Sequence, residues 1–402
     1  MNTKVIILSI LSVFSFYSCT YENPIKTSKQ PVYEIFMDIN KTKDIFLKDF
    51  VGEIRYIKLE TNKENSFSGI NKLVVNSKGI FILDQFKTRK VYHFSHEGKF
   101  LASIGKMGKG PGEYILPSDF IYDKKTNTIE IADNFTRAIS IYNLNGDFIK
   151  KIYYNDYRLN AFTKLNNGNY LVKLGKNKGS EFEKYNFLLT GPDMRTISKF
   201  ITSEYEIDFV NKQIFSNQIE NTLLFNIGLN DTIYQFKDDS YSALYYINFG
   251  KLKFPSDMLK QDEKSVMPLL LTKDYASYIS NLIQLEELIC FSFLSKRKTY
   301  MCFLNPETKN YIVTNNIVGE GDEVYSKPPN TIYNAYLYFN IDAFEISKNS
   351  NVDSSIADSN KKTFGIFDDI KDIQRNTNLD DNSILVMIKP NEAQIVKQMS
   401  KK

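Results

Sequence analysis

The feature of this sequence that most constrains its fold is a stretch of about 50 residues that occurs twice in succession. In each copy a β-prone run ends in an aspartate, at Asp84 and at Asp133, and a polar turn containing an arginine follows. A second β-prone run and a glycine turn complete each copy, and the two aspartates are 49 residues apart. This order of strands and turns is typical of one antiparallel sheet. A repeat of this length predicts a β-propeller rather than a helical solenoid.

The rest of the chain contains further β-prone runs but no regular repeat. They lie at 170–172, 223–225, 232–236, 290–304, 336–339 and 384–388. Six blades of about 49 residues leave room for a tether, a helical insertion and an irregular segment. We therefore predict an all-β, six-bladed propeller of four-stranded antiparallel blades. Helical spacing of apolar residues predicts a helix within Met258–Leu285, and 390–402 reads as a polar tail.

The N-terminus has the pattern of a bacterial export signal. Lys4 precedes an apolar run, 5–16, that is too short for a membrane-spanning helix. The next residues, Phe16-Tyr17-Ser18-Cys19, are similar to a lipobox, in which a lipidated cysteine follows a small residue. Two interpretations are open: lipidation of Cys19, which we favour, and a cleaved secretory peptide in which Cys19 has no special role.

The favoured interpretation divides the chain into a signal peptide over 1–18, a tether over 19–31 and a propeller domain over 32–402. It places the protein in the envelope of a Gram-negative bacterium, at the outer membrane or the periplasmic face, where a lipid anchor contacts the membrane. The net charge is only +4, with lysines and acidic residues interleaved. The sequence therefore shows no strongly basic face, and we predict that the protein does not bind nucleic acid.

Two further cysteines, Cys290 and Cys302, flank a predicted hairpin with a turn at 295–298. Their spacing about this turn predicts near neighbours on adjacent strands. An oxidising compartment would permit a disulfide between them. We expect two buried thiols instead, because strand-pair geometry strains such a bond.

One stretch resembles a known family. Residues 104–114, IGKMGKGPGEY, are similar to the Gly-rich run of the bacterial six-bladed propeller lipoproteins, an NHL-repeat-like family. Similar segments at 54–61, 230–234, 247–251 and 380–386 extend the resemblance over most of 32–389. The resemblance implies ring closure by a strand near Ile54–Glu60 that pairs with the last blade, near Ile384–Lys389. It implies no particular activity, because propellers include binding proteins, hydrolases and lyases.

The glycines of this run could suggest a phosphate-binding loop, but Gly110 is followed by Pro111 rather than by Lys and Ser or Thr. We interpret the run as a crossover between blades, in which glycine and proline shape the turn. Its charged residues, Lys106, Lys109 and Glu113, are candidate ligand-binding side chains at the central funnel.

Two arginines, Arg89 and Arg137, recur at matching positions of the repeat. One interpretation is structural: packing, or ion pairs between blades with Glu113 as a partner. The other is functional: several such side chains ring one mouth of the funnel and bind an anionic ligand. We favour the structural role and keep both arginines as candidate binding residues.

Candidate metal ligands are polar residues at strand ends: Asp84, Asp133, Asn134 and Asp231. If they converge in the funnel, their oxygens suit Ca²⁺, which some six-bladed propeller esterases and lactonases hold there. Alternatively, each caps a turn by accepting backbone N–H bonds. His93 and His96 face opposite ways on a strand, so they predict no shared metal site, and His93 is expected in the core.

These patterns together predict a lipid-anchored envelope propeller that binds an unknown small-molecule or protein ligand. They assign no catalytic residue and no cofactor. A different class of function stays open as the alternative: a Ca²⁺-dependent hydrolase or lyase with its site in the central funnel.

Overall fold

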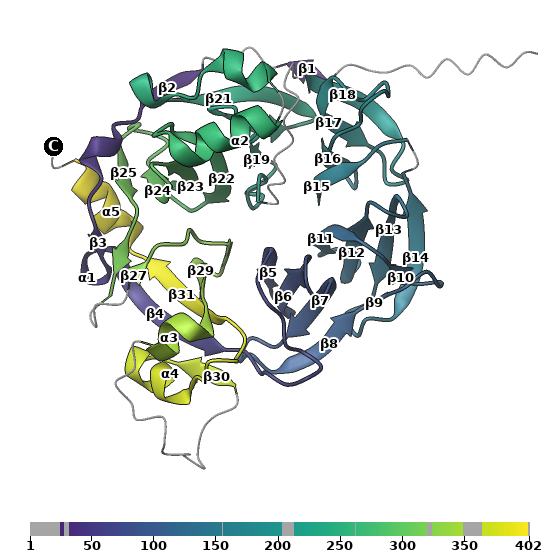
Figure 1. Ribbon diagram of the computed structural model, residues 1–402, viewed down its shortest axis with the longest axis horizontal. Coiled ribbons are helices and arrows are strands. Elements are labelled where there is room, and N and C mark those ends of the chain that lie inside the picture. The colour runs from purple at the N-terminus through teal and green to yellow at the C-terminus, as the bar shows by residue number, and fades with distance from the viewer. Residues whose placement is uncertain are drawn as a thin grey trace, which may run out of the picture.

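The computed structural model describes residues 25–27, 32–154, 156–202, 213–261, 263–319, 324–348 and 364–400. This part of the chain is an all-β propeller, whose antiparallel sheets stand around a central axis (Figure 1). The predicted signal peptide, Cys19 and most of the predicted tether lie outside the described residues. The fold class predicted from the repeat is confirmed as a propeller built mainly of four-stranded antiparallel sheets.

Four of the sheets consist of four strands in sequence order. They are β5 (Lys72–Asn76), β6 (Gly79–Asp84), β7 (Lys90–Phe94) and β8 (Phe100–Ile104); β11 (Pro117–Asp123), β12 (Thr128–Asp133), β13 (Ala138–Tyr142) and β14 (Phe148–Tyr153); β15 (Leu159–Lys164), β16 (Tyr170–Leu174), β17 (Tyr185–Thr190) and β18 (Thr196–Thr202); and β22 (Ser277–Gln284), β23 (Ile289–Ser295), β24 (Lys298–Leu304) and β25 (Tyr311–Thr314). The first two sheets are the two copies of the repeat.

Three further sheets include strands from the start of the chain. They are β19 (Leu223–Phe225), β20 (Thr232–Lys237) and β21 (Ser240–Asn248), joined by β1 (Lys26–Thr27) and β2 (Tyr33–Phe36); β28 (Thr331–Tyr333), β29 (Tyr336–Ile341), β31 (Ile384–Pro390), β4 (Val51–Lys58) and β30 (Gly365–Phe367); and β27 (Val324–Tyr325), β26 (Ile317–Val318) and β3 (Ile45–Phe46). Two more short strands, β9 (Lys106–Met107) and β10 (Glu113–Tyr114), pair with each other in the crossover between the two repeats.

The described residues thus form seven sheets of three or more strands, and the predicted number of six blades is wrong. The additional sheet is the smallest, β27–β26–β3, between the sheet of β25 and the sheet of β4 (Figure 1). Each of its strands has two residues. Strands this short show no alternation of apolar and polar residues, so the sequence gives no signal for this sheet.

The predicted ring closure is confirmed. β4 pairs antiparallel with β31, with Ile57 opposite Leu385 and Ile54 opposite Ile388. β30 covers the other edge of β4. A strand from the start of the domain therefore completes the last sheet, which leaves no open edge at the junction.

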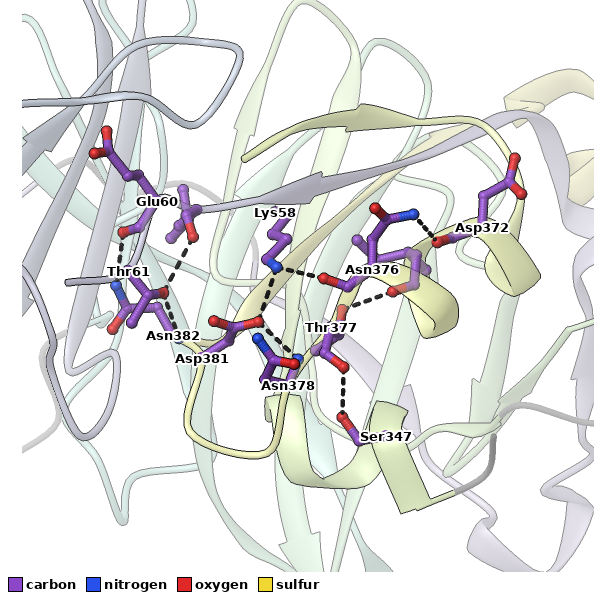
Figure 2. A network of polar contacts seen from close by, with 12 residues as sticks. Lys58, Glu60, Thr61, Ser347, Asp372, Asn376, Thr377, Asn378, Asp381 and Asn382 are labelled. Carbon is purple, nitrogen blue, oxygen red and sulfur yellow. Dashed lines mark hydrogen bonds and ion pairs between the residues drawn. The ribbon is translucent and has the colours of Figure 1, made fainter. Parts of the chain in front are cut away.

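A buried lysine stabilises this junction (Figure 2). Lys58, at the end of β4, is only 2% exposed. Its Nζ lies 2.9 Å from Oδ2 of Asp381 and also contacts the carbonyl oxygen of Asn376. Asp381 in turn accepts the N–H of Asn378 at 2.7 Å. The Lys58 ammonium thus fixes both the end of the α4 helix (Ile370–Asn376) and the loop before β31.

Asn382 fastens the same loop to the segment after β4 (Figure 2). Its Nδ2 donates to the carbonyl oxygens of Glu60 and Asn65, both at 3.1 Å. Its Oδ1 accepts the N–H of Phe67 at 3.0 Å, and its own N–H donates to Thr61 at 2.9 Å. One buried side chain therefore satisfies backbone groups on both sides of the closure.

The residues after β31 are not a polar tail, contrary to the sequence-based prediction. They form α5 (Glu392–Met399), which packs against α1 (Leu47–Phe50) with Ile395 and Met399 buried. Gln398 donates to the carbonyl oxygen of Asp49 at 3.0 Å. The other helices are α2 (Glu263–Thr272) and α3 (Ala343–Lys348). No helix in the described ranges is long and apolar enough to cross a membrane.

The helical insertion is shorter than predicted, because β22 already begins at Ser277. The pairing of β22 with β23 shifts between Ser277 and Ser280 and again between Ser280 and Ile283. Paired residues therefore recur every third position, and apolar residues on this strand follow a helix-like spacing. The predicted helix was wrong from 277 onward for this reason.

Cys290 and Cys302 are both buried free thiols, as expected. Cys290 lies opposite Phe303, and Cys302 lies opposite Phe291. The two cysteines are thus one register position apart, and their side chains enter different apolar clusters on the two faces of the sheet. Burial raises the pKa of both thiols, which keeps them protonated.

Candidate ligand-binding cavity

A cavity of about 540 Å³ lies at the centre of the ring. Residues of β5, β11, β15, β22 and β28 line it together with residues 213–218. Each of these strands stands at the inner end of its sheet (Figure 1). The volume falls within the range of small-molecule sites, so this cavity is the candidate functional site.

Two lysines on the cavity wall are paired with buried carboxylates. Nζ of Lys72, on β5, lies 2.7 Å from Oδ1 of the fully buried Asp119. Nζ of Lys164, on β15, lies 2.7 Å from both Asp123 and Glu130. Burial acts to lower the pKa of Lys164, but the two carboxylates outweigh it and raise the pKa above its usual value. These lysines are charged, and their charge is compensated within the protein.

Side-chain amides form another part of the wall. Gln213 contacts Asn281 and donates to Oδ1 of Asn330 at 3.2 Å. Asn330 donates to Asn340 at 2.9 Å, and Ser292 donates to Oδ1 of Asn281 at 2.9 Å. Asn281 has φ +51°, a left-handed conformation that asparagine tolerates better than most residues. The network fixes the orientation of these amides before any ligand arrives.

Asn76, at the end of β5, is another amide among the lining residues. Its Oδ1 accepts the N–H of Lys78 at 2.7 Å. Its Nδ2 is buried and has no hydrogen-bond partner among the described residues. Leaving a buried donor unpaired costs about 1–3 kcal/mol. Because this Nδ2 is enclosed by protein atoms, it is not open to a ligand in the cavity.

Three aromatic side chains, Tyr122, Phe215 and Tyr333, add apolar surface to the wall. Tyr122 donates to Oδ1 of Asn127 at 2.7 Å. The ring of Tyr333 stacks on His96, with centroids 5.5 Å apart and an angle of 14° between the planes. The site therefore combines hydrogen-bonding amides with aromatic faces, which is typical of small-molecule sites.

The predicted metal residues Asp84 and Asp133 do not line the cavity. Asp84 accepts the N–H of Ser68 at 3.0 Å and of Lys87 at 3.1 Å. Asp133 accepts the N–H of Ile115 at 2.9 Å. Burial acts to raise the pKa of Asp84, but these N–H groups outweigh it and hold the pKa below its usual value. Each aspartate thus fixes the segment that enters its own sheet, which explains its recurrence.

The other two predicted ligands also lie away from the cavity lining. Asn134 donates to the carbonyl oxygen of Leu159 at 2.6 Å and accepts its N–H at 3.1 Å, which joins neighbouring sheets. Asp231 is buried in the turn between β19 and β20. No group of three His, Cys, Asp or Glu side chains in the described ranges could hold a metal ion. The four predicted ligands therefore do not converge on one site and do not fit Ca²⁺.

The crossover residues and the repeated arginines lie outside the cavity as well. Glu113 accepts the N–H of Gly110 at 2.7 Å and pairs with Lys106 at 3.1 Å, so its partner is not one of the arginines. The Gly110 N–H, followed by Lys106, lowers the pKa of Glu113. Arg89 and Arg137 have φ of +53° and +49° and occupy equivalent turn positions. Lys109 is exposed in the same crossover.

His93 is buried, as predicted. Its ring stacks on Phe81 with centroids 4.2 Å apart, and its nitrogens contact the carbonyl oxygens of Lys78 and Leu144 at 2.9 and 3.1 Å. The side chain joins two neighbouring sheets and has no access to the cavity lining.

We expect Asp231 to make stability depend on pH. Burial raises its pKa to about 7, partly opposed by Lys253, and one carboxylate oxygen has no partner among the described residues. Below the unfolded pKa of about 3.8 the carboxyl is protonated in both the folded and the unfolded protein, and the contribution of Asp231 to stability is fully present. As pH rises toward 7 the unfolded protein releases this proton more readily than the folded one, so the free energy of unfolding falls. A tenfold difference in proton affinity between the folded and unfolded protein corresponds to about 1.4 kcal/mol. Asp231→Asn should therefore remove this slope and stabilise the protein above pH 7, by a few kcal/mol at most.

The measurement is urea unfolding of wild type and Asp231→Asn across this pH range. Other groups titrate in both proteins, so the difference between the two free energies of unfolding isolates Asp231. Parallel pH profiles for the two proteins would contradict the assignment.

Sequence reasoning missed the residues that line the cavity, among them Asn76, Gln213, Asn281 and Asn330. Asn76 and Asn330 are single polar residues next to strand ends, where such residues are typical of turns, and Asn281 fell within the predicted helix. Nothing in the spacing of these residues marks a common site. A signal was present only for Asn76, which stands next to a glycine turn after a strand.

Fold and cavity define a β-propeller with a ligand-sized site on its axis. The family model "Domain of unknown function (DUF4934)" matches residues 31–389, and the chain belongs to this family. The predicted membership in a propeller family is confirmed by this match. That the family is NHL-repeat-like, and that the protein is a lipoprotein, stay predictions.

Several solved structures are similar to this chain at low sequence identity. A Bacteroides fragilis protein described as exported has a TM-score of 0.69 and 18% identity, over 90% of this chain and 99% of that chain. A duf4221 family member from Bacteroides vulgatus has a TM-score of 0.48 and 10% identity, over 84% and 98%. The extracellular domain of a one-component system from B. thetaiotaomicron has a TM-score of 0.39 and 9% identity, over 66% and 30%. No curated protein matches the chain.

Proposed function

We propose that the protein is an exported, lipid-anchored binding module of the cell envelope, and that it binds a small polar ligand in the central cavity. The observation that carries the proposal is the cavity at the centre of the ring, about 540 Å³ in volume and lined by side-chain amides and aromatic rings. Apolar surface combined with a few placed polar groups is typical of sites for small molecules.

The wall also constrains the chemistry of the ligand. Lys72 and Lys164 are paired with carboxylates, so these two lysines require no negative charge on the ligand. Hydrogen-bonding groups facing the amides of the wall and an apolar or ring face against Tyr122 or Tyr333 fit the lining. A neutral molecule with hydroxyl or carbonyl groups meets these requirements.

A cavity-filling substitution tests the site. Thr163, on β15, lines the cavity and is partly exposed, so Thr163→Trp should occupy the space without disturbing the core. Thr272→Trp, at the exposed end of α2, is the matched control. Each protein is dialysed against an extract of bacterial culture, and retained small molecules are identified by mass spectrometry.

We expect wild type and Thr272→Trp to retain the same compound, and Thr163→Trp to lose it. Retention by all three proteins would place the ligand elsewhere. No retention by wild type would contradict the proposed function.

The proposed location has its support in the N-terminal signal and in the exported relative that shares the fold. Cys19→Ser should move the protein from the detergent phase to the soluble fraction, because acyl chains would supply most of the membrane affinity. Continued membrane partition of Cys19→Ser, with no palmitate label in wild type, would show that the anchor is wrong.

A further inference from the structure

The two sheets of the repeat expose a phenylalanine at the same place. Phe86 follows Asp84 in the turn after β6, and Phe135 follows Asp133 in the turn after β12. Phe86 is 71% exposed and Phe135 is 63% exposed. A single exposed apolar residue is ordinary, but the same large aromatic at two equivalent positions calls for a reason.

The two turns lie at the same end of adjacent sheets. Lys72 is opposite Leu83 in the first sheet, and Asp119 is opposite Ala132 in the second. Because Lys72 and Asp119 are in contact at 2.7 Å, the strand ends that precede the two turns are neighbours. Leu116, 39% exposed, adds to this surface, since its N–H donates to Asp133.

The phenylalanine side chains do not cap these turns. The aspartates already cap them through backbone N–H groups. Arg89 and Arg137 adopt φ near +50°, where asparagine or glycine would be less strained. A long cation nevertheless occupies this position in both copies.

The charges around the phenylalanines are mainly positive. Lys87 and Arg137 are exposed, and Arg89 is partly exposed. The acidic residues of the same turns, Asp84 and Asp133, are buried beneath them. We call the set Phe86, Lys87, Arg89, Leu116, Phe135 and Arg137 the repeat face. None of its residues lines the central cavity.

We propose that the repeat face docks an acidic segment of a partner protein that carries aromatic or aliphatic anchor residues. Aromatic side chains and arginines are the residue types that contribute most to protein–protein interfaces. Positive charge around an apolar centre favours a partner of opposite charge and accelerates its encounter. This interaction is separate from the ligand in the cavity.

The test uses the full domain and fluorescent synthetic peptides of equal length. One carries acidic residues with Phe and Leu anchors, a second carries the anchors with lysines, and a third carries the acidic residues with the anchors replaced by serine. Fluorescence anisotropy measures affinity at low and high salt. The variants are Phe86→Ser with Phe135→Ser, and Arg89→Asn with Arg137→Asn. Phe36→Ser, at a residue that is 67% exposed on β2, is the matched control.

We expect the acidic anchored peptide to bind at least about tenfold more tightly than either other peptide, a difference of about 1.4 kcal/mol. Both double variants should weaken it by a similar factor, and the control should not. Salt should weaken binding to wild type more than to the arginine variant. Equal binding of the acidic and basic peptides, unchanged affinity of the double variants, or no binding of the acidic peptide would overturn the proposal. Thermal melts of all variants establish that they are folded.

Discussion

Truncation after Asn382 is expected to abolish folding of the domain. It removes β31, which lies between β29 and β4 in the closing sheet. The apolar side chains of this strand at Ile384, Leu385, Val386 and Ile388 are fully buried. Their loss also exposes the edges of both neighbouring strands, which are aggregation sites. We expect insoluble or protease-sensitive protein, measured by fractionation and limited proteolysis.

Truncation after Pro390 is the matched control, because it keeps β31 and removes α5. The product should be soluble but less stable, since Ile395 and Met399 leave the cluster against α1. Burial of one such side chain contributes about 1.5–3 kcal/mol. A soluble, cooperatively melting product from the Asn382 truncation would show that β31 does not close the ring.

Asp119→Ala is expected to destabilise the domain by about 3–5 kcal/mol, because it leaves a charge without its buried partner. Asp119 is fully buried and accepts Lys72 Nζ at 2.7 Å through Oδ1. Its Oδ2 accepts the N–H of Phe162, on β15, at 2.9 Å. One carboxylate therefore joins three consecutive sheets around the cavity. Denaturant unfolding measures the change.

Two comparisons make this result specific. Asp193→Ala removes an exposed carboxylate that pairs with Arg195 at 3.3 Å, and it should cost less than about 1 kcal/mol. Lys72→Met combined with Asp119→Leu removes both charges, so it should be less damaging than Asp119→Ala alone. Equal stability of Asp119→Ala and wild type would show that the ion pair does not hold the sheets together.

The propeller class could be predicted because it depends on local pattern: each repeat carries strand periodicity, a capping aspartate and a glycine turn. The ring closure was predicted from the family resemblance instead, because no local pattern tells which strand pairs with β31. The number of blades could not be predicted, since β3, β26 and β27 have only two residues each. α5 was missed because its two buried residues, Ile395 and Met399, are spaced among charged and polar ones.

The cavity was beyond sequence reasoning for a different reason. Gln213, Asn281 and Asn330 are far apart in sequence and meet only when the ring closes. Asp84 and Asp133 stand out in the sequence because they recur in the repeat. They recur because each caps the turn that follows its strand. The residues that recur in the repeat therefore have structural roles, whereas the cavity is lined by residues that do not recur.

The most direct test of ligand binding at the axis uses a single tryptophan. The chain contains none, so Tyr333→Trp introduces one reporter at the cavity wall. Phe36→Trp provides a reporter at an exposed site on β2, away from the cavity lining. The titrant is the compound fraction that wild type retains in dialysis. We expect a saturable change in fluorescence for Tyr333→Trp and none for Phe36→Trp. No change in Tyr333→Trp, or the same change in both proteins, would contradict the central cavity as the binding site.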